Sequence, residues 1–454
     1  MRRLLLLLLL AAFAWTGSGC SGSGDSTTRS PGLTVALYPY VPRLGQFRQV
    51  IESAWKEVHP ESTITWAEDW DGGYYQDPDP RFDVYVYDAC FLDYFRRQNW
   101  LYPIPEDRVP DIPDFFQFLL DEVVQGGYFD SVPQLLCTNI LCYEANDPGL
   151  GRARTLSEVT EAIGTCTFYG RRPQDRTGAM VNFSENQAIA FAYIQSEQER
   201  TATFPIQYPW SREEVNLEGV FCLKKIISSS SLENALYDSH EPYVRAEWFG
   251  QGSGRAHVGF TESLSRVTPA VAGTLALKRM PYADNPDGIQ TPLFYSDLIA
   301  VHPATLVRGT TGLAMELVRI MSSSRVLTDC IGPFQEEEPQ YLMPARISVF
   351  EVLAAQWPLY GKIEEMVRSV DPILMNLGPD IRDWLRSMPD VMKEMALSSL
   401  PCYCDHETGP IRDDEQAQES CPRVCTDYNG WNGQWTTPRP DGMSTCGCNE
   451  LCGP

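Results

Sequence analysis

The chain has 454 residues, of which 43% are hydrophobic and 21% charged, and its formal net charge is −24. This length suffices for two or more domains, each with its own core. The negative charge argues against a protein that binds nucleic acid or an anionic membrane by broad electrostatic attraction. It suits a soluble protein outside the cell, or one that receives a cationic ligand.

The N-terminal segment has the order of a secretory signal. Two arginines precede a short apolar run, and small residues then lead to Cys20. The run is too short for a convincing membrane span. Cys20 and the Ser/Gly-rich stretch after it resemble a bacterial lipoprotein signal, although Gly17 stands where such signals have leucine. We therefore expect 1–30 to be a signal peptide and tether, and the chain to be exported, either secreted or held at the cell envelope by a lipid on Cys20.

From Leu33 onward, strand patterns alternate with helix patterns. The spacing of apolar residues predicts strands over 33–41, 62–70, 82–88 and 295–303. It predicts helices over 46–60, 112–124, 156–164 and 310–324. Thr155 and Glu158 form a capping box before the third of these helices, and 256–264 is expected to be a strand that runs into a turn or helix. The alternation favours an α/β fold with largely parallel sheets and helices on both faces.

Ligands of such folds bind beyond the carboxyl ends of the strands. Three acidic residues are expected at those ends: Asp88, Glu262 and Asp297. Aromatic residues crowd the same positions: Tyr38, Tyr40, Trp66, Trp70, Tyr85, Tyr87, Tyr243, Trp248 and Tyr295. Rings and carboxylates together suit a flat, cationic heteroaromatic ligand. The alternatives are strand-end caps or a solvated helix start for the acids, and core packing for the rings.

The 14 cysteines divide between Cys20, the body and the C-terminal segment. Those of the body are Cys90, Cys137, Cys142, Cys166, Cys222 and Cys330. In an exported chain cysteines are expected to pair. Without Cys20 their number is odd, so at least one thiol is left over, and Cys137 is eligible; the alternative is a disulfide between Cys137 and Cys142. We expect Cys90 to be a disulfide partner, the alternative being a second reactive thiol.

The segment 401–454 differs in composition from the body. It is rich in Cys, Gly, Pro and Asp and has hardly any aliphatic run. Because apolar burial cannot supply it with a core, we expect a small tail held together by disulfides. A zinc site is the alternative, but His406 is the one histidine there. Its cysteines are Cys402, Cys404, Cys421, Cys425, Cys446, Cys448 and Cys452.

Familiar catalytic motifs are missing from the sequence. It has no GxSxG, Walker A or HExxH motif, and no GxGxxG with the right flanks. Its five histidines carry no local signature of a Cys–His protease. If Cys137 is a nucleophile, its base is therefore expected to be a carboxylate.

Four segments together resemble thiaminase I. They are PQLLCTN around Cys137, YDACFLDYF, GFTESLS and LFYSDL, and their order and separation also fit that family. The resemblance covers residues 33–400. It implies a two-lobed α/β body over 31–400, like a type II periplasmic binding protein, with the active site in the cleft and the tail 401–454 outside the resemblance.

The resemblance also implies a reaction, that of a thiamine pyridinylase. A cysteine thiolate adds to C6 of the thiamine pyrimidine, the thiazolium leaves the bridging methylene, and an amine or thiol replaces it. By motif position the cysteine is Cys137 and the glutamate base is Glu262. Acids that hold the aminopyrimidine correspond to Asp88 and Asp297, and tyrosines of the cleft to Tyr38, Tyr40, Tyr243 and Tyr295. A further tyrosine position is Phe260 here.

Two other functions stay open at this point. One is a thiamine- or pyrimidine-binding lipoprotein that serves an ABC importer without catalysis, since function belongs to the site rather than the fold. The other is an adhesive surface protein whose working part is the tail. The pair of Cys137 and Glu262 favours the enzyme, because a binder does not need it. We expect a monomer with no metal, no cofactor and no nucleic-acid partner.

Overall fold

The computed structural model describes residues 32–164, 171–173, 175–237, 241, 243–285, 291–335, 337–397, 404–427, 430–435 and 442–448. The expected signal and tether, with Cys20, lie outside these residues, as do Cys166, Cys402 and Cys452. Within the described part, no helix is both long and apolar enough to cross a membrane. The same residues contain no cluster of His, Cys, Asp and Glu that could hold a metal ion.

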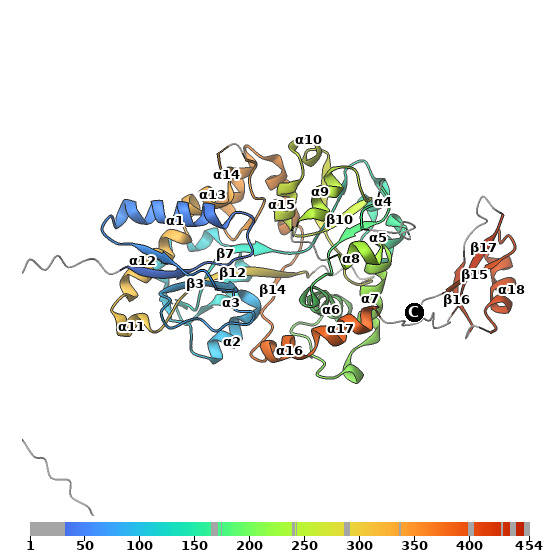
Figure 1. Cartoon of the computed structure of the whole chain (residues 1–454), viewed down its shortest axis with the longest axis horizontal. Coiled ribbons are helices and arrows are strands. Elements are labelled where there is room, and N and C mark those ends of the chain that lie inside the picture. The colour runs from blue at the N-terminus through green and yellow to red at the C-terminus, as the bar shows by residue number, and fades with distance from the viewer. Residues whose placement is uncertain are drawn as a thin grey trace, which may run out of the picture.

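The body consists of two α/β lobes side by side (Figure 1). In the first lobe, the main sheet has the strand order β13-β7-β12-β3-β1-β2, and β14 pairs with β12. These strands are β1 (Leu33–Ala36), β2 (Ile64–Trp66), β3 (Val84–Asp88), β7 (Val132–Cys137), β12 (Leu293–Val301), β13 (Met343–Pro344) and β14 (Ile373–Leu374). Every residue of β3 and β12 is buried, so these two strands form the centre of the core.

Helices cover this sheet, and a small second sheet lies beside it. The helices of this part are α1 (Leu44–Val58), α2 (Leu92–Arg97), α3 (Gln117–Val123), α11 (Thr305–Arg308), α12 (Thr311–Met321), α13 (Ser324–Ile331), α14 (Ile347–Ala354) and α15 (Pro358–Arg368). The small sheet has the order β4-β6-β5. Its strands are β4 (Ile104–Pro105), β5 (Val124–Gln125) and β6 (Tyr128–Phe129).

The second lobe is built on a sheet with the order β11-β8-β10-β9. Its strands are β8 (Ile140–Glu144), β9 (Ala179–Val181), β10 (Ala256–Gly259) and β11 (Leu275–Arg279). The helices around it are α4 (Pro148–Arg152), α5 (Leu156–Ile163), α6 (Asn186–Thr201), α7 (Leu217–Ser228), α8 (Leu232–Ala235), α9 (Val244–Gly250), α10 (Pro269–Ala272), α16 (Ile381–Ser387) and α17 (Pro389–Leu397). The predicted capping box of Thr155 and Glu158 is present at the start of α5, which confirms that prediction.

The expectation of largely parallel sheets is wrong. β12 is antiparallel to both β3 and β7, and β8 is antiparallel to both β10 and β11. The reason lies in the crossings between lobes. β7 leads into β8 of the second lobe through Thr138 and Asn139 without a helix, and the chain later returns along β12. β12 enters the sheet of the first lobe from the second lobe. It therefore runs opposite to β3 and β7, which both point toward the second lobe.

The predicted helix over 112–124 is interrupted. A 3-10 turn covers Ile112–Asp114 and α3 starts only at Gln117, with Phe115 and Phe116 extended between them. Phe115 forms a β-bridge with Arg346, whose guanidinium lies 3.9 Å from the centre of the Phe115 ring. The guanidinium of Arg346 also donates to the carbonyl oxygens of Pro110 and Asp111. Tertiary contacts with Arg346 therefore override the local helix pattern here.

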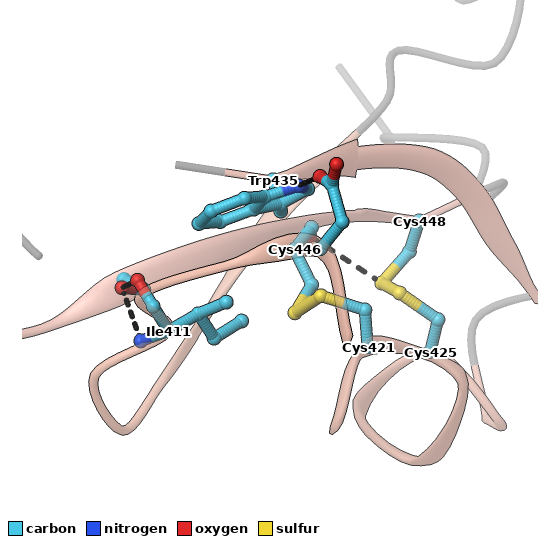
Figure 2. Close-up of a disulfide and its surroundings, with 8 residues drawn as sticks. Ile411, Cys421, Cys425, Trp435, Cys446 and Cys448 are labelled. Atoms are coloured by element: carbon cyan, nitrogen blue, oxygen red, sulfur yellow. Dashed lines mark hydrogen bonds between the residues drawn. A yellow bond between two sulfur atoms is a disulfide. The ribbon is translucent and has the colours of Figure 1, made fainter. Parts of the chain in front are cut away.

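The tail folds as a unit with its own small core. β15 (Cys404–Thr408), β17 (Ser444–Cys448) and β16 (Trp431–Trp435) form an antiparallel sheet, against which α18 (Asp414–Val424) packs. Disulfides join Cys421 to Cys446 and Cys425 to Cys448, so both link the helix to β17 (Figure 2). The expectation of disulfides in the tail is confirmed, and these four cysteines are not zinc ligands.

The cysteines of the body behave differently from the expectation. In the described part of the body, five cysteines are free thiols: Cys90, Cys137, Cys142, Cys222 and Cys330. The predictions that Cys90 is a disulfide partner and that Cys137 could pair with Cys142 are therefore wrong. These residues lie on separate elements of the two lobes, and most are buried as small apolar side chains in the core, where a cysteine packs well without a partner.

This arrangement makes the tail more sensitive to reduction than the body. We expect dithiothreitol to expose the tail to trypsin, with rapid cleavage after Arg412 and Arg423, because the tail depends on its disulfides. The body should stay resistant to trypsin, because those of its cysteines that the structure describes are free thiols. Peptide mapping of timed digests with and without reductant measures both. A body that becomes equally sensitive on reduction would contradict the assignment of free thiols.

Candidate active site

Four of the predicted site residues meet where β7, β12 and β3 lie next to one another. Asp88, the last residue of β3, lies directly opposite Asp297 of β12. Cys137, the last residue of β7, lies opposite Tyr295 of β12. The sequence predicted Asp297 at the end of its strand, and this prediction is wrong. It lies inside β12, at an irregularity of the register with β7, and antiparallel pairing places it at the edge where β3 and β7 end.

Asp88 is buried and receives three hydrogen bonds. Its side chain accepts from the Cys90 backbone N–H at 2.9 Å, from the Tyr74 hydroxyl at 2.9 Å and from the Tyr38 hydroxyl at 3.3 Å. Burial raises the pKa of the Asp88 carboxyl, and these donors oppose the rise. The donors therefore favour an ionised Asp88 in spite of its burial.

Tyr74 was missed by the sequence reasoning, although the stretch DGGYY offers a signal. Gly72 and Gly73 have φ angles of +76° and +99°, and a Cβ on Gly72 would lie 2.5 Å from the Tyr38 ring. Both conditions favour glycine. Two adjacent glycines before a tyrosine pair thus indicate a loop that packs closely against neighbouring rings. This packing places the Tyr74 hydroxyl within hydrogen-bond distance of Asp88.

Glu262 comes from the second lobe. β10 ends at Gly259, and a 3-10 turn over Thr261–Arg266 follows, as the sequence predicted. Ser263 fixes this turn, since its hydroxyl donates to the Phe260 carbonyl at 2.6 Å and lies 2.9 Å from Nε2 of the buried His257. Glu262 is 5% exposed, and burial raises the pKa of its carboxyl to about 7. A carboxyl with a pKa near neutrality is suited to accept and return a proton.

The acidic side chains of both lobes act on one another and on Cys137. Burial, then Glu262, Asp297 and Asp88, raise the pKa of the Cys137 thiol well above its ordinary value. Burial, Asp88 and Glu262 likewise raise the pKa of Asp297. These surroundings favour the thiol form of Cys137 and the neutral form of Asp297, and a cationic group would oppose both effects.

The predicted tyrosines surround these groups. The rings of Tyr38 and Tyr40 meet edge to face at 5.4 Å, and Tyr40 meets Tyr74 in the same way at 6.0 Å. Tyr40 is 55% exposed and so forms the outer side of this cluster. Tyr243 precedes α9, and its hydroxyl has a raised pKa through burial, Glu262 and Cys137.

Tyr295 joins the two lobes. Its ring contacts Phe191 of α6 at 5.6 Å and Phe260 at 5.9 Å, both edge to face. Phe260 therefore keeps a ring contact, although it lacks the hydroxyl of the expected tyrosine. Of the other rings that the sequence singled out, Trp70, Tyr85 and Tyr87 are buried in the core of the first lobe, as the packing alternative stated.

Comparisons with known proteins identify relatives of this chain. A family model described as the Thiaminase-1 domain matches residues 138–283, and one described as Mannan-binding protein matches 414–448 of the tail. Thiaminase-1 of Paenibacillus thiaminolyticus is 30% identical over 396 residues, which cover 86% of this chain and 94% of that protein.

Solved structures lead to the same family. Thiaminase I from Bacillus thiaminolyticus is 29% identical with a TM-score of 0.75, covering 80% of this chain and 99% of that one. Thiaminase I of Clostridium botulinum in complex with thiamin is 27% identical with a TM-score of 0.76 and the same coverage. Maltose-bound MalE3 of T. maritima, at 13% identity and a TM-score of 0.59 over 81% of this chain and 98% of that one, shares the fold. The chain therefore has the two-domain, type II periplasmic-binding-protein fold and belongs to the thiaminase-1 family of thiamine-degrading transferases.

Proposed function

We propose that the protein cleaves thiamine at its methylene bridge and transfers the pyrimidinylmethyl group to an amine or thiol through a covalent adduct on Cys137. The observation that carries this proposal is the free thiol of Cys137 within electrostatic reach of Glu262, whose pKa is raised to about 7. A relative, the Clostridium botulinum thiaminase I, has been solved with thiamin bound, which supports thiamine as the substrate.

The first step is the activation of Cys137. Its thiol has a raised pKa because the surroundings are apolar and negative. The thiazolium of thiamine is cationic, so its entry favours negative charge in the site. Glu262 then removes the thiol proton, and the thiolate adds to C6 of the pyrimidine. The nucleophile is thereby generated only when the substrate is present.

Asp88 and Asp297 are assigned to the aminopyrimidine. A carboxylate accepts a hydrogen bond from the exocyclic amine, and a protonated ring nitrogen makes the ring a better electrophile. Asp88 is held toward its ionised form by three donors, whereas Asp297 has a strongly raised pKa. Of two neighbouring acids, the ionised one can accept a hydrogen bond from the heterocycle, and the neutral one can share its proton with the same heterocycle.

The remaining steps restore the enzyme. The bond between the methylene and the thiazolium nitrogen breaks, and its electron pair leaves with the nitrogen as neutral thiazole. Glu262 releases the thiol proton to solvent, and the incoming amine or thiol then forms the new bond to the methylene and loses its own proton to Glu262. The bond from Cys137 sulfur to C6 breaks, the pyrimidine regains its aromaticity, and Glu262 returns this proton to the sulfur. Tyr38, Tyr40, Tyr243 and Tyr295 line the path, where their rings stabilise the cation.

The solute-binding alternative shares the fold but needs no nucleophile. A protein that only captures thiamine would gain nothing from a thiol placed beside a carboxyl of raised pKa, because neither group is required for affinity. The presence of both groups in one site therefore favours catalysis.

A second proposal concerns the tail, which we infer binds mannose-containing glycans. The match of 414–448 to a family described as Mannan-binding protein supports it. Trp431 and Trp435 lie half-exposed on β16, and the Trp435 indole N–H donates to the Asp414 carboxylate at 3.0 Å. An indole face beside a carboxylate suits a sugar, which stacks its C–H groups on the ring and donates hydroxyls to the acid.

Replacing the nucleophile separates catalysis from binding. We expect Cys137→Ser to lower formation of the base-exchange product from thiamine and aniline on the order of 10³-fold or more, while the Kd for thiamine changes little. Intact-mass spectrometry of wild type should detect the pyrimidinylmethyl adduct, and the variant should lack it. Cys222→Ser, which alters a free thiol on α7, is the matched control. Unchanged activity in Cys137→Ser would contradict the proposal.

The raised pKa of Glu262 predicts a pH profile. Because the base must be ionised, wild-type kcat/KM should rise with pH up to about 7 and level off above it. Glu262→Gln should lose this rising limb and lower kcat/KM by roughly 10²- to 10⁴-fold. Rates measured from pH 5 to 9 test this. A variant that keeps the wild-type profile would assign the titrating group to another residue.

The same residue predicts a change in stability. The folded state binds the Glu262 proton more tightly than the unfolded chain, so stability is lost as pH rises from 4.5 through about 7. Glutamine cannot ionise and escapes this loss. Relative to wild type, Glu262→Gln should gain up to about 3 kcal/mol of unfolding free energy between pH 5 and pH 8. Urea unfolding at both pH values measures it, and an equal difference at the two would argue against a buried, titrating Glu262.

The glycan proposal is tested with the full chain. We expect binding to a mannose-rich glycan array, and Trp435→Ala should weaken it by about tenfold or more. Trp210→Ala, at a 49% exposed tryptophan of the second lobe, should bind as wild type does. Thiamine cleavage should be equal in all three proteins. No glycan binding by the oxidised wild type would refute the proposal.

A further inference from the structure

We propose that Arg382 is a positioning residue for thiamine cleavage, because it holds the loop 71–77 so that the Tyr74 hydroxyl meets Asp88. The inference rests on the role proposed above for Asp88 in binding the pyrimidine. Arg382 itself lies on α16, 309 positions from Gly73 in the sequence, and it is not among the groups assigned to the substrate.

The loop 71–77 (the Tyr74 loop) is ordered by hydrogen bonds from its own start. The Asp71 carboxylate accepts from the backbone N–H groups of Gly73 at 3.0 Å, Tyr75 at 2.7 Å and Gln76 at 3.1 Å. The Gly72 carbonyl accepts from the N–H of Asp88 at 3.1 Å. The loop is thereby tied directly to the backbone of the residue that Tyr74 serves.

Arg382 closes the loop from the inside. Its side chain is 1% exposed. Its Nε donates to the Gly73 carbonyl at 2.7 Å, and its two Nη groups donate to the Gln76 carbonyl and the Asp77 carboxylate. The carbonyls of 73 and 76 lie on either side of Tyr74 in the chain. One planar guanidinium thus fixes both ends of the short segment that carries the tyrosine.

Aromatic rings fix the guanidinium in turn. It lies 4.8 Å from the centre of the Tyr94 ring and 5.9 Å from those of Phe91 and Phe95. Phe91 also meets the Tyr74 ring edge to face at 5.1 Å, and a Cβ on Gly73 would lie 2.7 Å from the Phe95 ring. Arg382 and Tyr74 therefore share one packed cluster, and a shift of the guanidinium changes the position of the loop.

Lysine cannot replace this arrangement. An ammonium group is a point charge on a flexible stem, whereas the guanidinium donates in a fixed fork to several acceptors at once. Arg382→Lys keeps the charge and loses the fork. The Gly73 and Gln76 carbonyls then have no common partner, and the distance from the Tyr74 hydroxyl to Asp88 is no longer fixed.

The test is a double-mutant cycle on thiamine cleavage. We expect Arg382→Lys and Tyr74→Phe each to lower kcat/KM about tenfold, and the double variant to be less than twofold below Tyr74→Phe alone. Such non-additivity shows that Arg382 acts through Tyr74. A merely structural role would lower kcat/KM by the same factor in both backgrounds, which would overturn the inference. Arg386→Lys, on the solvent side of α16 with a side chain 57% exposed, is the control.

A second variant keeps the test independent of the buried arginine. Asp77, the ion-pair partner of Arg382, is 61% exposed, so Asp77→Asn leaves the fold intact. It should lower kcat/KM about two- to threefold in wild type and leave it unchanged in the Tyr74→Phe background. If Tyr74→Phe and Asp88→Asn both leave cleavage unaffected, the proposed pyrimidine site fails as well. If they impair cleavage and the Arg382 and Asp77 effects are additive, the role of Arg382 alone is refuted.

Discussion

The site depends on the antiparallel pairing of β12 with β3 and β7. This pairing places Asp297 opposite Asp88 and Tyr295 opposite Cys137. Side chains of directly paired residues lie within contact distance, so the sheet itself sets the spacing between the proposed nucleophile, its neighbouring ring and two acids. The second lobe adds Glu262 to this frame through the turn after β10. Because burial fixes the register of a central strand, the positions of Asp88, Asp297, Cys137 and Tyr295 follow from the pairing of β12.

This geometry has an electrostatic consequence. Three buried carboxyl groups surround a partly buried thiol, and each of them raises the pKa of that thiol. The burial of so many acids is unfavourable for the empty protein, and a cationic heterocycle relieves it. In the proposed function, the same negative charge that raises the pKa of the Cys137 thiol also favours a positively charged substrate. In the proposed mechanism, binding and activation of the nucleophile are thereby joined, and the donors from Cys90, Tyr74 and Tyr38 favour the ionised form of Asp88.

Much of the candidate site could be predicted from the sequence, but the residues that hold its side chains in place could not. Cys137, Asp88, Glu262 and the four tyrosines were expected, and the structure brings them together between the lobes. Tyr74 and Arg382 were missed. The stretch DGGYY offered a local signal for Tyr74, whereas Arg382 belongs to no recognisable motif and acts on a loop about 300 positions away. The disulfide partner expected at Cys90 was wrong because counting cysteines takes no account of distance, and a buried thiol is stable in a core without a partner.

By itself, the sequence determined the local elements, since the periodicity of apolar residues and the capping box at Thr155 act over a few neighbouring positions. It also determined the separate character of the tail, because a segment without aliphatic runs needs disulfides to hold a fold. Only the tertiary structure decided the direction of β12, the broken helix before Gln117 and the loop held by Arg382. Each of these depends on a partner distant in the chain, and the free energy of such a contact is set by packing rather than by local propensity.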